Sequence, residues 1–255
     1  MPKIVAVANQ KGGVGKTTTS VNLTAALHKK GHSVLLIDCD PQGNATSGMG
    51  IPKNTKPNLY DQLVGNEEMQ NCIVETPYGD VIPSNKVLSA ATVELVEVEN
   101  AEFLLRDQIK TLQKEYDYII LDCPPSLELL SVIAFTAAES VLIPLQCEYY
   151  ALEGIADLIG TIKLCNKNLN PKLHLEGILL TMYDSRTNLT QQVAWEVKKF
   201  FEDRIFETVI PRSIKLAEAP SFGKPGIIYD KWNRGSRAYM KLADEFIHRQ
   251  SLPED

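Results

Sequence analysis

The sequence predicts an α/β domain in which helices cover both faces of a doubly wound, mostly parallel β-sheet. Five short apolar runs rich in β-branched residues recur along the 255 residues, and stretches of helix length separate them. The runs are nearly continuous rather than alternating, as strands buried on both faces of a parallel sheet should be. Strands that alternate with helices of this length imply right-handed crossovers.

The expected elements follow one another without a repeat or a Gly/Ser linker, so we expect one domain over residues 1–255. The strands are expected at residues 4–8, 34–37, 118–121, 141–144 and 178–181, and the helices at 17–30, 99–115, 127–138, 151–167, 189–201 and 233–250. In the helix at 189–201, Val193, Val197 and Phe200 form the stripe of a helix with one buried face. Residues 43–83 are rich in Gly, Pro and Asn, which indicates loops and short helices.

Composition excludes several classes of protein. A chain with 44% hydrophobic and 23% charged residues is neither disordered nor collagen-like. The five scattered cysteines and the lack of a signal peptide indicate reduced thiols in a cytoplasmic protein. No apolar run reaches the 18 residues of a membrane span. The net charge of −6 argues against a protein that coats nucleic acid with its whole surface, although it does not exclude a basic patch.

A glycine-rich loop lies between the first expected strand and the first expected helix. It reads Asn9-Gln10-Lys11-Gly12-Gly13-Val14-Gly15-Lys16-Thr17-Thr18. Glycines let successive backbone N–H groups point at an anion, and the helix that starts near Lys16 adds its N-terminal dipole. In a P-loop, Lys16 would neutralise the β- and γ-phosphates and the Thr17 hydroxyl would bind Mg²⁺. The loop therefore predicts a nucleotide site with Mg²⁺, made by residues 11–18; ATP as the nucleotide follows from the family resemblance given below.

The loop departs from the usual pattern G-x-x-x-x-G-K-[ST]. Gln10 stands where the first glycine is usual, and a second lysine, Lys11, stands at the head of the loop. A flexible turn with solvated lysines is the alternative interpretation, and the strand before and the helix after the loop argue against it.

Two expected strands end in acids that suit a metal site. Asp122 follows the run at 118–121, at the carboxyl edge where ligands of open α/β sheets bind, and would hold Mg²⁺ through a water. Asp38 and Asp40 follow the second strand and, two residues apart, share one side of an extended chain. We predict Asp38 as a further metal residue, and one acid of the pair as the group that orients the attacking water. A helix cap or a loop acid is the alternative for either alone.

These motifs resemble those of the deviant-Walker-A ATPases, the ParA/MinD family, and most closely the small chromosomal (Soj-type) ParA proteins. The resemblance rests on the loop at 11–18 and on residues 38–44, 120–125, 146–154, 181–187 and 218–221, and it extends over nearly the whole chain. It implies a Mg²⁺-dependent ATPase whose hydrolysis is slow and partner-stimulated.

The resemblance also implies a role for each site residue. Lys11 would be the signature lysine that reaches across an ATP-sandwich homodimer to the partner's phosphates, in the manner of an arginine finger. Gly12 would lie where the two subunits approach most closely. Asp40 would position the hydrolytic water and Asp122 would be the Walker B acid. The segments that enclose the adenine are matched by Met182 and Pro211.

A DNA-binding surface is the next implication, because chromosomal ParA dimers bind double-stranded DNA without sequence preference. Residues 182–241 carry eleven Lys and Arg against seven Asp and Glu, a local charge of +4 that leaves −10 for the rest. By family position, Arg186 and Lys215 are the candidates for phosphate contacts. A solvated basic face explains the same count without DNA. The expected protein partner is a ParB-like centromere-binding protein.

Several alternatives share the phosphate loop. A MinD-like membrane regulator needs a basic amphipathic C-terminal helix, whereas this chain ends in Pro253, Glu254 and Asp255, so we expect no membrane partner. An iron–sulfur reductase needs two interior cysteines per subunit, and only Cys123 lies beside the metal acid. A biosynthetic ligase would add a substrate domain, for which we see no room.

A ParA-like ATPase that positions another cargo, such as a plasmid, remains open. Because the first strand begins the chain, we expect no N-terminal helix-turn-helix and no operator-specific autorepression.

Overall fold

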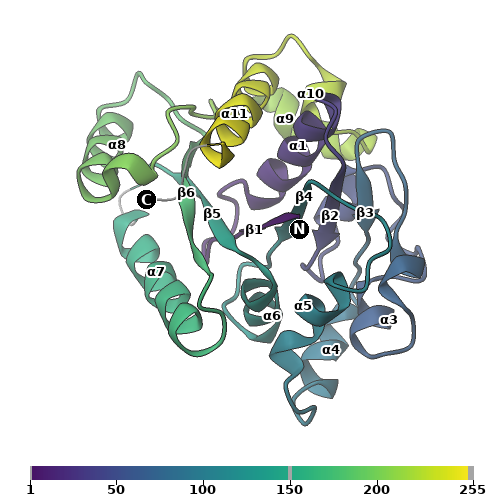
Figure 1. Ribbon diagram of the computed structural model, residues 1–255. Helices are drawn as coiled ribbons and strands as arrows, with labels where there is room; N and C mark the ends of the chain where they lie inside the picture. Colours follow the sequence, from purple (N-terminus) through teal and green to yellow (C-terminus); the bar gives the residue numbers. More distant parts are fainter. Residues whose placement is uncertain (1, 149–150, 252–255) are drawn as a thin grey trace.

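The structure of the protein is a computed structural model that describes residues 2–148 and 151–251. In this part of the chain, six parallel strands form a single sheet. Their order is β3-β2-β4-β1-β5-β6 (Figure 1). The strands are β1 (Lys3–Val7), β2 (Val34–Asp38), β3 (Asp80–Ile82), β4 (Tyr118–Asp122), β5 (Ser140–Gln146) and β6 (His174–Thr181). Every neighbouring pair is parallel, which confirms the predicted doubly wound fold.

Helices cover both faces of this sheet. Figure 1 shows α1, α9, α10 and α11 on one face and α3 to α7 on the other, with α8 beside the edge strand β6. The helices are α1 (Lys16–Lys29), α2 (Asn44–Gly48), α3 (Leu59–Leu63), α4 (Leu88–Glu94), α5 (Leu104–Ile109), α6 (Leu129–Ala137), α7 (Ala151–Asn168), α8 (Asn188–Phe201), α9 (Ile214–Glu218), α10 (Gly226–Tyr229) and α11 (Arg234–Gln250). Four 3₁₀ turns complete the described part of the chain: η1 (Met69–Cys72), η2 (Ala101–Phe103), η3 (Glu202–Arg204) and η4 (Ala219–Phe222).

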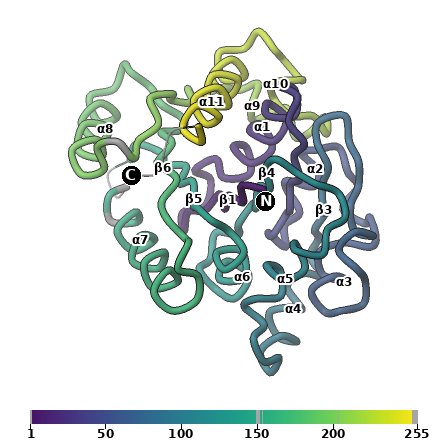
Figure 2. The backbone as a smooth tube through the Cα atoms, viewed as in Figure 1, coloured from purple at the N-terminus to yellow at the C-terminus, as the bar shows by residue number. Residues whose placement is uncertain are grey.

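The central strand β1 separates two hydrophobic cores. Val5 and Val7 pack into the core that contains α1 and α11, whereas Ala6 packs into the core that contains α6. This follows from the period of two, by which successive side chains of a strand point to opposite faces. The tube in Figure 2 shows α11 beside α1, and the hydroxyls of Thr19 and Tyr239 join them at 3.0 Å.

Strand register brings the acidic strand ends to one level. Asp122 of β4 lies opposite Val7 of β1 on one side and Asp38 of β2 on the other. The loop that follows β1 therefore starts at the same edge as both carboxylates. This edge carries the candidate site.

The five predicted strands are present, but three local expectations were wrong. Residues 43–83 contain β3 as well as short helices; its three residues are too few to give an apolar run. The expected helix at 99–115 is only η2 and the short α5; Asn100, with a φ of 60°, precedes η2 and prevents a helix from starting at residue 99. On α8, Val193 and Val197 are buried as predicted, but Phe200 is 70% exposed and Phe201 packs against the core instead.

Other expectations are confirmed. All five cysteines are buried free thiols. The terminal helix α11 buries Tyr239, Leu242 and Phe246 against the sheet. Across residues 2–148 and 151–251, no helix is long and apolar enough to cross a bilayer.

Candidate functional site

The loop between β1 and α1 forms a backbone cradle at the carboxyl edge of the sheet. Gly13 and Gly15 adopt φ values of 76° and 92°, which residues with a Cβ rarely adopt, so the curl of the loop requires glycine there. The Asn9 side-chain amide donates to the carbonyl of Pro144 at 2.8 Å, and the Thr181 hydroxyl donates to the carbonyl of Val14 at 2.7 Å. The cradle is thus tied to β5 and β6.

Lys16 lies inside this cradle. Its side chain is buried, and its Nζ donates to the carbonyl oxygen of Lys11 at 3.0 Å. Burial lowers the pKa of Lys16, while the negative charges of Asp122 and Asp40 act in the opposite direction. The sequence predicts that Lys16 binds the phosphates. In the structure, its ammonium group lies next to the loop backbone and close to these two acids.

Asp122 is fully buried, as is Asp38 on the neighbouring strand. The two oxygens of Asp122 accept hydrogen bonds from Thr17 Oγ1 at 2.8 Å and from Ser20 Oγ at 2.7 Å. Burial and the neighbouring charge of Asp38 raise the pKa of Asp122 to about 8, although the two hydroxyls lower it. A cation at this carboxylate would relieve both unfavourable effects. The structure thus pairs Thr17 with Asp122, two metal residues that the sequence selected.

Asp38 faces a different set of donors. One oxygen accepts from both the backbone N and the hydroxyl of Thr46 at 2.7 Å, and the other accepts from the backbone N of Asp40 at 3.2 Å. Burial raises the pKa of Asp38 to about 6 against these hydrogen bonds. Asp38 therefore positions α2 in this structure, and its contact with a metal remains a prediction.

Asp40 lies just beyond β2 and is nearly buried. Its Oδ1 accepts from the backbone N of Gln42 at 2.9 Å, and its carbonyl oxygen accepts from Ser84 Oγ at 2.9 Å. Ser84 follows β3, so this bond connects two strand ends. In the part of the chain that the structure describes, the second oxygen of this carboxylate accepts no hydrogen bond.

The donor set fits Mg²⁺ that arrives with a nucleotide. In the described part of the chain, no group of three or more His, Cys, Asp or Glu side chains is arranged to hold a metal. Mg²⁺ in nucleotide sites keeps several waters and uses one or two protein ligands beside phosphate oxygens. The Thr17 hydroxyl and the Asp122 carboxylate match that need.

Lys11 and Gly12 lie at the outer rim of the cradle. Lys11 Nζ is 3.5 Å from Glu148 Oε2, and both side chains are partly exposed. A Cβ built on Gly12 would meet no atom within 4 Å. Nothing within the described subunit therefore requires glycine at position 12.

Thr18 lies beside a cavity of about 250 Å³ at the start of α1. Asn44 of α2 and Pro220 and Lys224 near η4 also line it.

Met182 and Pro211, which mark the predicted adenine segments, are not among the residues that line this cavity. Tyr183, next to Met182, pairs with Pro211, and the backbone N of Tyr183 donates to the Ile210 carbonyl at 2.9 Å. The structure brings these two segments together, and their contact with a base stays a prediction.

Arg186 and Lys215, the predicted DNA contacts, lie on the surface. Arg186 follows β6 and donates from Nε and Nη2 to Asp184 at 2.9 and 2.7 Å, which lowers the pKa of Asp184 to about 2. On α9, Lys215 Nζ donates to Glu218 Oε2 at 2.9 Å. Each cation is thus already paired with an acid of its own chain.

Sequence reasoning missed four polar residues that position the site: Ser20, Thr46, Ser84 and Thr181. Ser20 follows Thr17 by three residues, so helical spacing could have placed both on one face. Thr181 is the last residue of the expected strand at 178–181, and this position predicts that it lies at the carboxyl edge of the sheet. Thr46 and Ser84 carry no such signal, because they come together only when β2 and β3 pair.

A strand, a glycine cradle around a buried lysine, and a helix whose first hydroxyl bonds a buried strand-end acid define the P-loop class of nucleotide-binding proteins. The family model described as "AAA domain" matches residues 2–175. The chain belongs to this family and, within it, to the Soj/ParA group of chromosome-partitioning ATPases.

Similar proteins are found at high identity and nearly full coverage. The chain is 53% identical over 248 residues to the sporulation initiation inhibitor protein Soj of Bacillus subtilis (strain 168), covering 96% of this chain and 98% of that protein. It is 50% identical over 252 residues to the chromosome partitioning protein ParA of Myxococcus xanthus (strain DK1622), covering 98% and 89%.

Solved structures agree with the fold. The cobyrinic acid a,c-diamide synthase of Mycobacterium smegmatis with bound ATP analog and magnesium has a TM-score of 0.87 at 34% identity, with 98% of this chain and 97% of that one covered. The cell division ATPase MinD of Pyrococcus furiosus has a TM-score of 0.79 at 26% identity, with 98% and 100% covered.

Proposed function

We propose that this protein is a Mg²⁺-dependent ATPase that dimerises around ATP, binds DNA non-specifically as a dimer and partitions a chromosome or plasmid with a ParB-like partner. The observation that carries the proposal is the contrast between a buried lysine, Lys16, and an outward-facing lysine, Lys11, on one phosphate loop. The relatives named for chromosome partitioning support the same function.

Each residue of the site has a part in hydrolysis. The loop N–H groups and Lys16 would bind the phosphates, and Thr17, with Asp122 through a water, would hold Mg²⁺. The ion would neutralise charge on the phosphate oxygens. Asp40 would orient the attacking water through its second oxygen. A solved relative that holds an ATP analog with magnesium supports this choice of cofactors.

Lys11 would act on the nucleotide of the other subunit. To do so it must leave Glu148, which costs little because exposed ion pairs contribute about 0–1 kcal/mol. ATP carries four negative charges, so a second cation at its phosphates is strongly favoured. ATP would thus favour the dimer, and hydrolysis would release it.

DNA binding would use Arg186 and Lys215. Their pairs with Asp184 and Glu218 are exposed, so DNA phosphates can compete for the cations. Two subunits bring twice as many phosphate contacts as one, and affinity then depends steeply on salt. A monomer with few contacts would remain off the DNA.

The test is filter binding of unrelated duplexes with and without ATP. We expect binding only with ATP and similar affinity for every sequence. Binding of equal strength without ATP, or none with ATP, would contradict the proposal. Stimulation of hydrolysis by a ParB-like protein together with DNA tests the partner.

The comparisons weaken one alternative, a biosynthetic enzyme, and leave a second, another cargo, open. The chain spans 97% of the M. smegmatis synthase structure, so length alone does not exclude a protein of that name. Identity favours partitioning, because it is 50% to the chromosome partitioning protein ParA of M. xanthus and 34% to the synthase. A different cargo would leave the ATPase unchanged and is distinguished by the partner that stimulates it.

A further inference from the structure

A short segment that begins in α4 exposes valines and glutamates side by side. Val93, Val96 and Val98 are 75%, 73% and 43% exposed, and the glutamates that follow each of them, Glu94, Glu97 and Glu99, are exposed as well. We call these six residues the valine–glutamate surface. Figures 1 and 2 show α4 at the outer end of the helical layer that also holds α3 and α5.

The exposure of these valines is not a consequence of an unpacked helix. The opposite face of α4 buries Leu88 and Ala91, and Leu95 just beyond it is buried as well, all in the core beneath the sheet. The helix therefore already has its packed face. Burial of an exposed valine side chain is favourable, so three exposed valines offer a partner apolar surface to cover.

Charge selects the kind of partner. Between Val87 and Leu105 the chain carries four glutamates and no lysine or arginine. Among the ion pairs of the described residues, none involves Glu94, Glu97 or Glu99. Carboxylates without a cation beside them repel DNA and anionic membranes and attract Lys and Arg.

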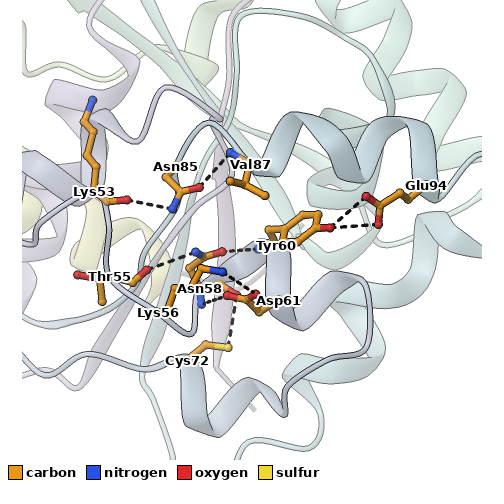
Figure 3. Close-up of polar contacts among 10 residues, drawn as sticks. All are labelled: Lys53, Thr55, Lys56, Asn58, Tyr60, Asp61, Cys72, Asn85, Val87 and Glu94. Carbon is orange, nitrogen blue, oxygen red and sulfur yellow. Dashed lines mark hydrogen bonds and ion pairs between the residues drawn. The ribbon is translucent and has the colours of Figure 1, made fainter.

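Hydrogen bonds fix both ends of α4, the helix that carries Val93 and Glu94. Figure 3 shows Tyr60 of α3 donating its hydroxyl to both oxygens of Glu94, at 3.0 and 3.2 Å. At the other end of α4, Asn85 accepts from the N of Val87 at 3.0 Å and donates to the carbonyl of Lys53 at 2.9 Å. A surface ordered before binding loses less entropy when a partner binds.

We propose that the valine–glutamate surface binds a basic, aliphatic segment of a partner protein. Lysines or arginines of that segment pair with Glu97 and Glu99, and its aliphatic side chains cover Val93 and Val96. The surface lies apart from the phosphate loop and needs no nucleotide to form, so this inference does not depend on the proposed ATPase.

Two labelled ten-residue peptides serve as probes: one alternates Lys with Leu and the other alternates Lys with Ser. Fluorescence anisotropy with the full chain, without nucleotide, should show the Lys–Leu peptide binding about tenfold more tightly than the Lys–Ser peptide. Glu97→Lys with Glu99→Lys should weaken binding of the Lys–Leu peptide about tenfold or more, and Val93→Ser with Val96→Ser about fivefold.

Control variants make the same kinds of substitution at exposed sites outside the valine–glutamate surface, and so test whether the effect depends on where the residue lies. Glu67→Lys with Glu68→Lys makes the same charge change at two exposed acids after α3, and Leu164→Ser removes an exposed side chain of α7. Both should bind the Lys–Leu peptide like the wild type.

Three results would overturn the inference: equal affinity for both peptides, equal weakening by the control variants, or binding unchanged by Glu97→Lys with Glu99→Lys. Self-association of the wild type that the same double variant abolishes would assign the surface to a second copy and overturn it as well. Basal ATP hydrolysis, measured on each variant, should stay unchanged and reports separately on the proposed function.

Discussion

The two lysines of the phosphate loop differ in almost every physical respect. Lys16 is buried, bonded to the loop backbone and surrounded by acids, whereas Lys11 is about one-third exposed and pairs with the exposed Glu148. The first completes a site within one subunit, and the second points out of it. If Lys16 binds phosphate and Lys11 acts across a dimer, as proposed above, one loop serves both ATP binding and dimerisation, and mutations should separate these two roles.

Lys16→Ala should have the largest effect, because dimerisation as well as hydrolysis depends on bound ATP. We expect affinity for a fluorescent ATP analogue to fall about 100-fold or more, and hydrolysis and dimerisation to be lost with it. Affinity within about threefold of the wild type would show that Lys16 is not the phosphate lysine.

Asp40→Ala should leave ATP binding and dimerisation intact and abolish ATP hydrolysis. Hydrolysis should fall by about 10²–10⁴-fold while ATP binding persists, so that dimers accumulate. Size-exclusion chromatography with ATP measures this, and a variant that stays monomeric would contradict the assignment.

Gly12→Val should break association alone. A Cβ at this position has free space within the subunit, so the variant should fold and bind ATP like the wild type, yet fail to dimerise because two subunits collide. Lys11→Ala should also lose dimers, through charge rather than shape. Gly160→Val, at an exposed position of α7 with similar free space, is the control and should dimerise normally. Normal dimers of Gly12→Val would place the interface elsewhere.

Arg186→Ala and Lys215→Ala should act downstream of association. ATP-dependent dimers should form, and the slope of log affinity for DNA against log salt should become shallower by about 1 for each DNA phosphate that the variant no longer neutralises. Lys172→Ala, an exposed lysine before β6, is the control and should leave the slope unchanged. An unchanged slope in both variants would exclude these cations from the interface.

Ser20→Ala should have the smallest effect. It removes one hydrogen bond to the buried Asp122 carboxylate, worth about 1.5–3 kcal/mol, which lowers Tm by about 3–12 °C for a chain of this size. Calorimetry without nucleotide measures the shift, and exposed Ser185→Ala is the control. An unchanged Tm would mean that Ser20 does not support Asp122.

Most of the fold could be predicted from the sequence because apolar runs and helical periods are local signals. The phosphate loop, Thr17 and Asp122 could be predicted because a motif fixes their order and strand ends fix their edge. The exposure of Phe200 could not, because the neighbouring Phe201 competes for the same core position.

Contacts between distant segments lie beyond such reasoning. Ser84 and Asp40 meet only through the pairing of β3 with β2, and a three-residue strand gives no signal of its own. The pairing of Arg186 with Asp184 likewise depends on how the turn after β6 folds, so a count of charges could not show that this cation already has a partner.

The buried cysteines have a practical consequence. Burial raises the pKa of every thiol, to about 11 for Cys147 and about 12 for Cys72, so neither alkylating reagents nor mild oxidants find a thiolate at neutral pH. A single cysteine placed on the surface would thus be the one reactive thiol of the folded chain. A dye attached there would report the proposed association and dissociation of two subunits in real time, without removal of any native cysteine.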